Sequence, residues 1–168
     1  DDEVQYAELA RIAGDYQRLT VLYWGERQSD PDMVVERWLN GHTHKTSSQW
    51  YGDVRVETYS VPNEPVWRLE DSGVFFGDAI ELRGYSLGSE NYGQADVVQV
   101  TLSWVSHEKI HEDYTVFVHI YSQIQAPPVA QHDGAPGGGS SPTGRWRLGE
   151  KVLDRHGVQL PESIASGE

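Results

Sequence analysis

The stretch DVVQVTLSWVSHEKIHEDYTVFVHIY, residues 96–121, carries the strongest strand signals in the chain. Residues 96–105 and 114–121 are rich in β-branched and aromatic side chains, which favour strands over helices. The connection between them, residues 106–113, has the length of a hairpin loop. This stretch therefore predicts two strands of an antiparallel β structure.

The connection contains the letters H-E-x-x-H, from His107 to His111. In a zinc protease this pattern lies on a helix, so that both imidazoles reach one metal ion. Strands on both sides leave no room for that helix, and we interpret the segment as a solvated hairpin loop. Binding of an adventitious metal by His107 and His111 is a weaker alternative, and a metal-dependent hydrolase is disfavoured.

The second part of the chain continues as short strands separated by turns rich in glycine, proline and asparagine. Further strands are predicted at 66–70, 79–87, 128–132 and 151–155, with a long flexible loop at 133–144. Regular strand spacing without a helical pattern favours an antiparallel β-sandwich of jelly-roll or immunoglobulin-like type. Alternation within the strands gives the candidate core residues: Ile80, Leu82, Val98, Val100, Leu102, Trp104, Val116, Val118 and Ile120.

Residues 1–62 have a different character, and we predict a small α/β segment there, followed by the sandwich domain at 63–168. The pattern predicts helices at 3–14 and 29–41 and strands at 18–24 and 52–61, in a β-α-β arrangement. The second helix has start signals in Asp30 as N-cap and Pro31 at its first position. The segment containing His42 and His44 is interpreted as a plain loop in preference to a metal site.

Composition restricts the possible partners. The formal net charge is −13, from 26 acidic and 13 basic residues, so nucleic acid is not an expected partner. The chain has no cysteine, which excludes disulfides and thiolate chemistry. Neither a calcium loop nor a phosphate-binding loop motif is present, and no cofactor is expected.

Several motifs resemble the C-terminal extracytoplasmic region of bacterial dolichyl-phosphate-mannose–protein mannosyltransferase-like membrane proteins, glycosyltransferase family 39. The similar segments are DYTVFVHIY (113–121), VAQHDGAP (129–136), SSPTGRWRLGEKVLDRHGVQLPE (140–162) and, more weakly, RLTVLYWGERQSDPDMVVERWLNGH (18–42) with WYGDVRVETYSVP (50–62). The resemblance implies a parent enzyme that transfers sugar from a lipid-phosphate donor. The family's β domain continues with further strands, so the sandwich is expected to lack its terminal strands here.

The resemblance implies a non-catalytic accessory domain on the extracytoplasmic face of the bacterial cell membrane. No segment matches the family's catalytic region, so no catalytic residue is carried over. The implied partners are the membrane-embedded part of the parent protein and a glycan or polypeptide acceptor. An independent carbohydrate-binding module is the alternative, because aromatic faces stack on sugar rings. The speculative ligand-binding residues are Trp50, Tyr85, Tyr92 and Trp146.

Overall fold

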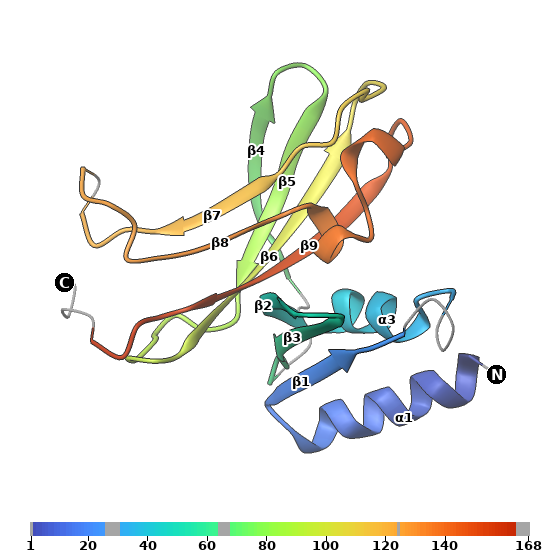
Figure 1. Ribbon diagram of the computed structural model, residues 1–168. Coiled ribbons are helices and arrows are strands. Elements are labelled where there is room, and N and C mark those ends of the chain that lie inside the picture. The colour runs from blue at the N-terminus through green and yellow to red at the C-terminus, as the bar shows by residue number, and fades with distance from the viewer. Residues whose placement is uncertain (1, 26–30, 64–67, 124, 164–168) are drawn as a thin grey trace.

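The computed structural model describes residues 2–25, 31–63, 68–123 and 125–163. It consists of a mixed sheet of seven strands, in the order β1-β3-β2-β9-β6-β5-β4, and a two-stranded ribbon, β7-β8 (Figure 1). The strands are β1 (Arg18–Tyr23), β2 (His44–Tyr51), β3 (Val54–Ser60), β4 (Glu70–Phe76), β5 (Ile80–Leu87), β6 (Val97–Ser106), β7 (Val116–Ile120), β8 (Ala130–Gly134) and β9 (Lys151–Gln159). The helices are α1 (Asp2–Asp15), α3 (Val34–His42) and the 3-10 turns η1 (Pro136–Gly139) and η2 (Thr143–Arg145).

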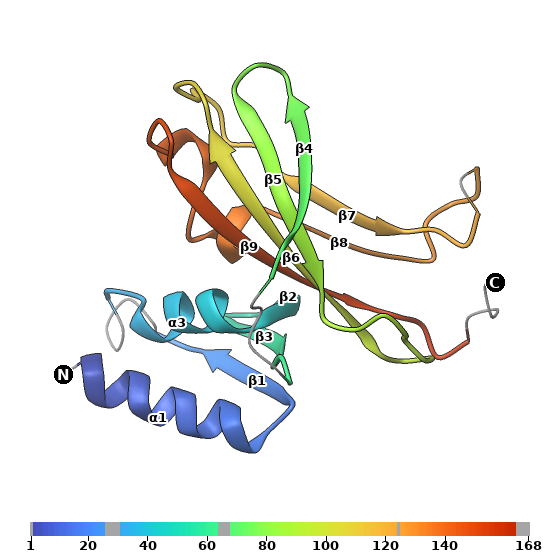
Figure 2. The same ribbon diagram turned by 180° about the vertical axis from the view of Figure 1, so that it is seen from behind.

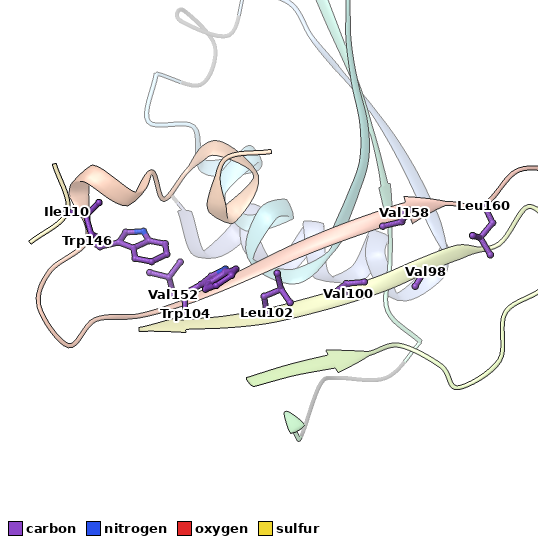
Figure 3. Packing of buried hydrophobic residues seen from close by; sticks show 9 residues of the cluster. All are labelled: Val98, Val100, Leu102, Trp104, Ile110, Trp146, Val152, Val158 and Leu160. Carbon is purple, nitrogen blue, oxygen red and sulfur yellow. The ribbon is translucent and has the colours of Figure 1, made fainter. Parts of the chain in front are cut away.

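Strands β6 and β9 form the centre of the larger core. They pair antiparallel from Val97 opposite Gln159 to Val105 opposite Lys151. Their alternate side chains point to one face and pack together with Ile110 and Trp146 from the loops (Figure 3). The β7-β8 ribbon covers this face, because Val116, Val118 and Ile120 pack against the same cluster. The core residues predicted from strand alternation all belong to this cluster or pack against it.

The helices and β1, β3 and β2 form the other end of the molecule (Figure 2). Trp38 and Leu39 of α3 pack against Tyr59 of β3, and Leu9 of α1 joins the same small cluster. The apolar side of α3 is therefore its packing face. Strand β3 pairs antiparallel with both β1 and β2.

The two ends of the molecule are joined through β2 and β9. These strands are parallel and share one backbone pair, Lys45 with His156. Gly157 allows the close approach, since a Cβ there would lie 2.6 Å from Thr46 Cγ2. Beyond this point β2 diverges from β9, and the divergence creates the site described below.

The mainly β prediction is confirmed, but its finer form differs from the structure. Over the described residues, the layer facing β6 and β9 is only a two-stranded ribbon, so neither a closed sandwich nor a jelly roll is formed. The β-α-β prediction is wrong, because β1 and β3 are antiparallel. His44, in the segment interpreted as a plain loop, is instead the first residue of strand β2. This polar strand lacks β propensity and forms because β3 and β9 pair with it on both sides.

Several element boundaries also differ from prediction. Helix α3 begins at Val34 because Met33 adopts a left-handed φ of 54°, which interrupts any helix running from Pro31; the predicted cap Asp30 lies outside the described residues. The strand predicted at 66–70 is β4, at 70–76; Val66 and Trp67 are outside the described residues. The loop predicted as flexible at 133–144 contains the end of β8, η1 and η2, with backbone hydrogen bonds throughout.

Candidate functional site

A polar cleft of about 520 Å³ lies where β2 diverges from β9. Strands β2 and β3 form one wall, and β8 with the glycine-rich turn η1 forms the other. The lining residues are Lys45, Ser47, Ser48, Arg55, Glu57, Gln131, His132, Asp133, Gly134, Ala135, Gly138, Gly139, Arg155 and His156. Most of these side chains are polar or charged, so the cleft can recognise a hydrogen-bonding ligand.

A buried network of four charges supports the β2-β3 wall. Lys45 Nζ lies 3.0 Å from Glu57 Oε1 and 3.5 Å from Glu36 Oε1. Arg55 lies 2.6 Å from Glu36 Oε2 and 3.1 Å from Glu57 Oε1. Tyr59 donates a further hydrogen bond to Glu57. Two cations and two carboxylates thus neutralise one another, which compensates for their desolvation.

The charge network also affects the pKa of Glu36, which packs behind the β2-β3 wall. Burial acts to raise the pKa of Glu36, but the hydrogen bond from Arg55 and the charge of Lys45 outweigh it and hold that pKa below the ordinary value. Glu36 is therefore a carboxylate at neutral pH. Lys45 also donates to the backbone oxygen of Gly138, at 3.1 Å, so the network is tied to the opposite wall.

A hydrogen-bonded chain of Asp154, His156 and His132 supports the second wall. Asp154 is fully buried, and its Oδ2 lies 2.8 Å from His156 Nε2. The same carboxylate accepts from Trp104 Nε1 at 3.3 Å and from the Gly137 amide at 2.9 Å. The Nδ1 atoms of His156 and His132 lie 2.8 Å apart. Burial, reinforced by the neighbouring His156, lowers the pKa of His132 to about 4.

The tautomers of both imidazoles follow from these contacts. An ionised carboxylate only accepts, so His156 carries its proton on Nε2. A singly protonated His156 then accepts at Nδ1, and His132 donates from Nδ1. His132 Nε2 is left with a lone pair, and no hydrogen bond in the described part of the chain engages this atom. His132, which lines the cleft, is therefore an oriented, neutral acceptor.

Turn η1 completes the wall because its glycines adopt conformations closed to most side chains. Gly137 and Gly138 both have φ of 63°. A Cβ on Gly138 would lie 2.5 Å from Asn40 Oδ1 of α3. Glycine at this position therefore allows the turn to approach both the helix and Lys45.

Arg155 and His44 lie next to the Asp154–His156 pair. His44 is 1% exposed and contacts Thr101 Oγ1 through Nε2, at 3.0 Å. Burial, with the nearby charge of Arg155, lowers the pKa of His44 to about 3, so this ring is neutral. Arg155 is half-buried and lines the cleft.

The outward face of the β7-β8 ribbon adds polar groups at the rim. His119 Nε2 lies 3.0 Å from Asp133 Oδ1, and Gln131 Nε2 donates to Asp133 Oδ2 at 3.1 Å. His119 alternates along β7 with Val118 and Ile120, which pack against the core. Gln131 and Asp133 line the cleft, so this cluster is continuous with it.

The four aromatic residues proposed from sequence do not converge. Trp50 is 63% exposed on β2, where its ring centroid lies 5.9 Å from the guanidinium of the cleft residue Arg55. Trp146 is 7% exposed and belongs to the main core. Tyr85 packs against that core and donates to Glu70, while Tyr92 lies in a separate polar pocket near Gln17 and Asn91. Only Trp50 stands beside the cleft.

The H-E-x-x-H segment is a loop, as interpreted from sequence, but it is not a hairpin loop, because β6 pairs with β5 and β9 whereas β7 pairs with β8. Ile110 is 4% exposed within the core, and His111 is exposed. His107 Nε2 lies 2.6 Å from Glu81 Oε2 on β5, so its partner is a strand carboxylate. Over the described residues, no group of three or more histidines and carboxylates is placed to hold a metal ion.

A second, mainly apolar pocket of about 610 Å³ opens at the far end of the main sheet. Trp104, Trp146, Phe76 and Phe117 contribute to its lining. It is separate from the polar cleft, with which it shares no lining residue.

Comparisons with protein-family models, curated proteins and solved structures find no match for the chain. None of the described helices is both long and apolar enough to cross a membrane. The candidate site therefore rests on the geometry of the chain itself. Sequence reasoning missed His132, His156, Asp154 and Arg155; the one available signal was the histidine beside the glycine-rich turn in QHDGAPGGG.

Proposed function

We propose that the chain is a non-catalytic extracytoplasmic domain of a membrane-bound glycosyltransferase, and that it recognises a glycan or glycosylated acceptor in the polar cleft. The membrane enzyme and the location are proposed from the family resemblance of segments 113–121, 129–136 and 140–162. Glycan recognition is proposed from the cleft. These two parts of the proposal can be tested separately.

The observation that carries the proposal is a rigid polar cleft with one exposed tryptophan beside it. Sugar sites combine fixed donors and acceptors for hydroxyl groups with an aromatic face for the apolar side of the ring. The buried charge network and the Asp154–His156–His132 chain fix the two walls before a ligand arrives. Such preorganisation reduces the conformational entropy that binding costs.

The rim cluster supports the same conclusion. His119, Gln131 and Asp133 come from two of the segments on which the family resemblance rests, and in the fold they form one hydrogen-bonded group at the cleft. Their remaining donors and acceptors are suited to ligand hydroxyls, which have both functions.

Glycan binding is tested by screening the purified domain on a glycan array and measuring hits by calorimetry. We expect Trp50→Ala and Gln131→Ala to weaken binding roughly tenfold each, through loss of stacking or of one hydrogen bond. Trp24→Ala is the matched control, because Trp24 is 75% exposed but lines none of the pockets described above. Absence of any hit, or an equal effect of all three variants, would refute glycan recognition at this cleft.

Sequencing the complete gene that encodes the chain tests the accessory role. Several apolar spans upstream of residue 1 in the same open reading frame would support the membrane glycosyltransferase. A stand-alone carbohydrate-binding module, which uses the same cleft, predicts no such spans.

A further inference from the structure

Among the described cations that line the cleft, Arg155 is the one without a hydrogen bond or ion pair to a carboxylate. Lys45 and Arg55 both pair with the carboxylates of Glu36 and Glu57. For the Arg155 guanidinium, by contrast, no hydrogen bond or ion pair occurs within residues 2–25, 31–63, 68–123 and 125–163. Its five N–H donors have only solvent in the cleft as a partner.

Partial burial of the Arg155 guanidinium without a hydrogen-bonding partner costs free energy. Burial lowers the pKa of Arg155, and the charge of the adjacent Asp154 only partly opposes that effect. Asp154 cannot supply the missing hydrogen bonds, since its two oxygens already accept from Gly137, His156 and Trp104. A half-buried arginine is normally paired, and a bound anion would supply the partner.

Over the described residues, the other titratable groups around the cleft do not pair with the guanidinium of Arg155. The carboxylate of Asp133 already accepts hydrogen bonds from His119 and Gln131 on the ribbon. His44 and His132 are neutral at physiological pH, because burial lowers both pKa values. Within the described lining, Arg155 thus offers a guanidinium without a hydrogen-bonded partner, although the chain as a whole has a formal net charge of −13.

His132 lines the same cleft and can supply the second recognition element through Nε2. Its lone pair accepts a hydrogen bond, while the guanidinium of Arg155 donates two parallel ones to an oxyanion. A ligand that satisfies both groups carries an anionic oxygen group and a free hydroxyl on one small molecule.

We propose that the cleft binds an acidic sugar, with Arg155 holding its oxyanion group and His132 accepting from one of its hydroxyls. This inference rests on the proposed glycan recognition and specifies the ligand class. A carboxylate, as in a uronic acid, and a sugar phosphate ester offer the same oxyanion chemistry, and the experiment separates them.

The test titrates the ¹⁵N-labelled domain with glucuronate, glucose 6-phosphate, glucose and inorganic phosphate, followed by amide shifts. We expect one of the two acidic sugars to bind on the order of ten- to a hundredfold more tightly than glucose, the ratio expected for a charge-assisted pair. Arg155→Gln should remove that difference, and Arg155→Lys should restore part of it. Arg147→Gln, outside the cleft, is the control.

Folding of the variants is monitored by their melting temperatures. Because Arg155 has no hydrogen bond or ion pair to lose within the described residues, Arg155→Gln should melt at or above the wild-type temperature. A large fall in melting temperature would show that Arg155 has a structural partner, and would overturn the inference.

The outcomes distinguish the two proposals. Equal binding of glucose and the acidic sugars, unchanged in Arg155→Gln, would overturn the acidic-sugar inference and leave glycan recognition intact. Binding of inorganic phosphate at Arg155 without any sugar would overturn glycan recognition and the acidic-sugar ligand together. No shift of cleft amides with any probe would overturn both as well.

Discussion

His132 and His156 face each other through their Nδ1 atoms at 2.8 Å, with the buried carboxylate of Asp154 behind His156. One hydrogen bond between two identical atoms requires one donor and one acceptor. The carboxylate requires a proton on His156 Nε2, which leaves Nδ1 of a singly protonated His156 as the acceptor. A residue with no solvent contact therefore determines which nitrogen His132 presents to the cleft.

Asp154→Asn should destabilise the fold by about 2–4 kcal/mol, because an amide cannot accept the three hydrogen bonds that converge on this carboxylate. Urea unfolding measures the loss, and ¹⁵N spectra of the imidazoles should show that His156 no longer holds its proton on Nε2 alone. Asp133→Asn is the control on the ribbon surface and should cost below about 1 kcal/mol. Equal losses for the two variants would contradict the proposed chain.

Stability should fall as the pH is lowered from about 6.5 towards 4. The pKa values of His44 and His132 are about 3 and about 4 in the folded state, below the unfolded value of about 6.5. The unfolded chain therefore binds more protons in this window, and each histidine contributes a slope of up to about 1.4 kcal/mol per pH unit. Their contribution is fully present above about pH 6.5.

Urea unfolding at several pH values between 4.5 and 7.5 measures this slope. The variant His44→Leu should reduce it by the share of one histidine. An unchanged slope in that variant would mean that His44 does not stay neutral in the folded state.

Lys45→Met should cost about 3–5 kcal/mol, because it leaves the buried carboxylates of Glu36 and Glu57 with one cation instead of two. The double variant Lys45→Met with Glu57→Gln should lose less than the two single variants added together. Arg11→Met, which breaks an exposed helix pair, is the control and should have little effect. Additive losses would show that the charges do not act as a network.

Truncation to alanine should lower the free energy of unfolding much more at Trp146 than at Trp50. Trp146→Ala removes a core side chain that is 7% exposed and should lower stability by about 3–5 kcal/mol. Trp50→Ala removes one that is 63% exposed and should change stability by less than about 1 kcal/mol. Calorimetric melting of both variants checks this. A destabilised Trp50→Ala would make its use as a binding variant uninformative.

Gly138→Ala should be more destabilising than Gly52→Ala. Both glycines have a left-handed φ, 63° and 61°, so both variants bear a similar backbone cost. Only the Gly138 methyl group meets a neighbour, Asn40, and this adds about 1–3 kcal/mol. Similar unfolding free energies for the two variants would show that η1 does not pack tightly against α3.

Sequence patterns predicted the strands whose side chains alternate strictly between apolar and polar. Val98, Val100 and Leu102 are spaced by two, and burial of one face is enough to specify both strand and core. The strand at 44–51 was not predicted, because its HKTSSQWY sequence has no such alternation. Pairing with β3 and β9 is what makes it a strand.

Sequence alone thus determined the mainly β class, the face of each central strand that is buried, and the loop conformation of the H-E-x-x-H segment. Those features follow from local propensity and periodicity, which are properties of neighbouring residues. Only the tertiary structure brought together Lys45 with Glu57, His132 with His156, and Arg155 with the cleft. The partners come from strands distant in sequence, and the divergence of β2 from β9, with the glycine contact at Gly157, decides where they meet.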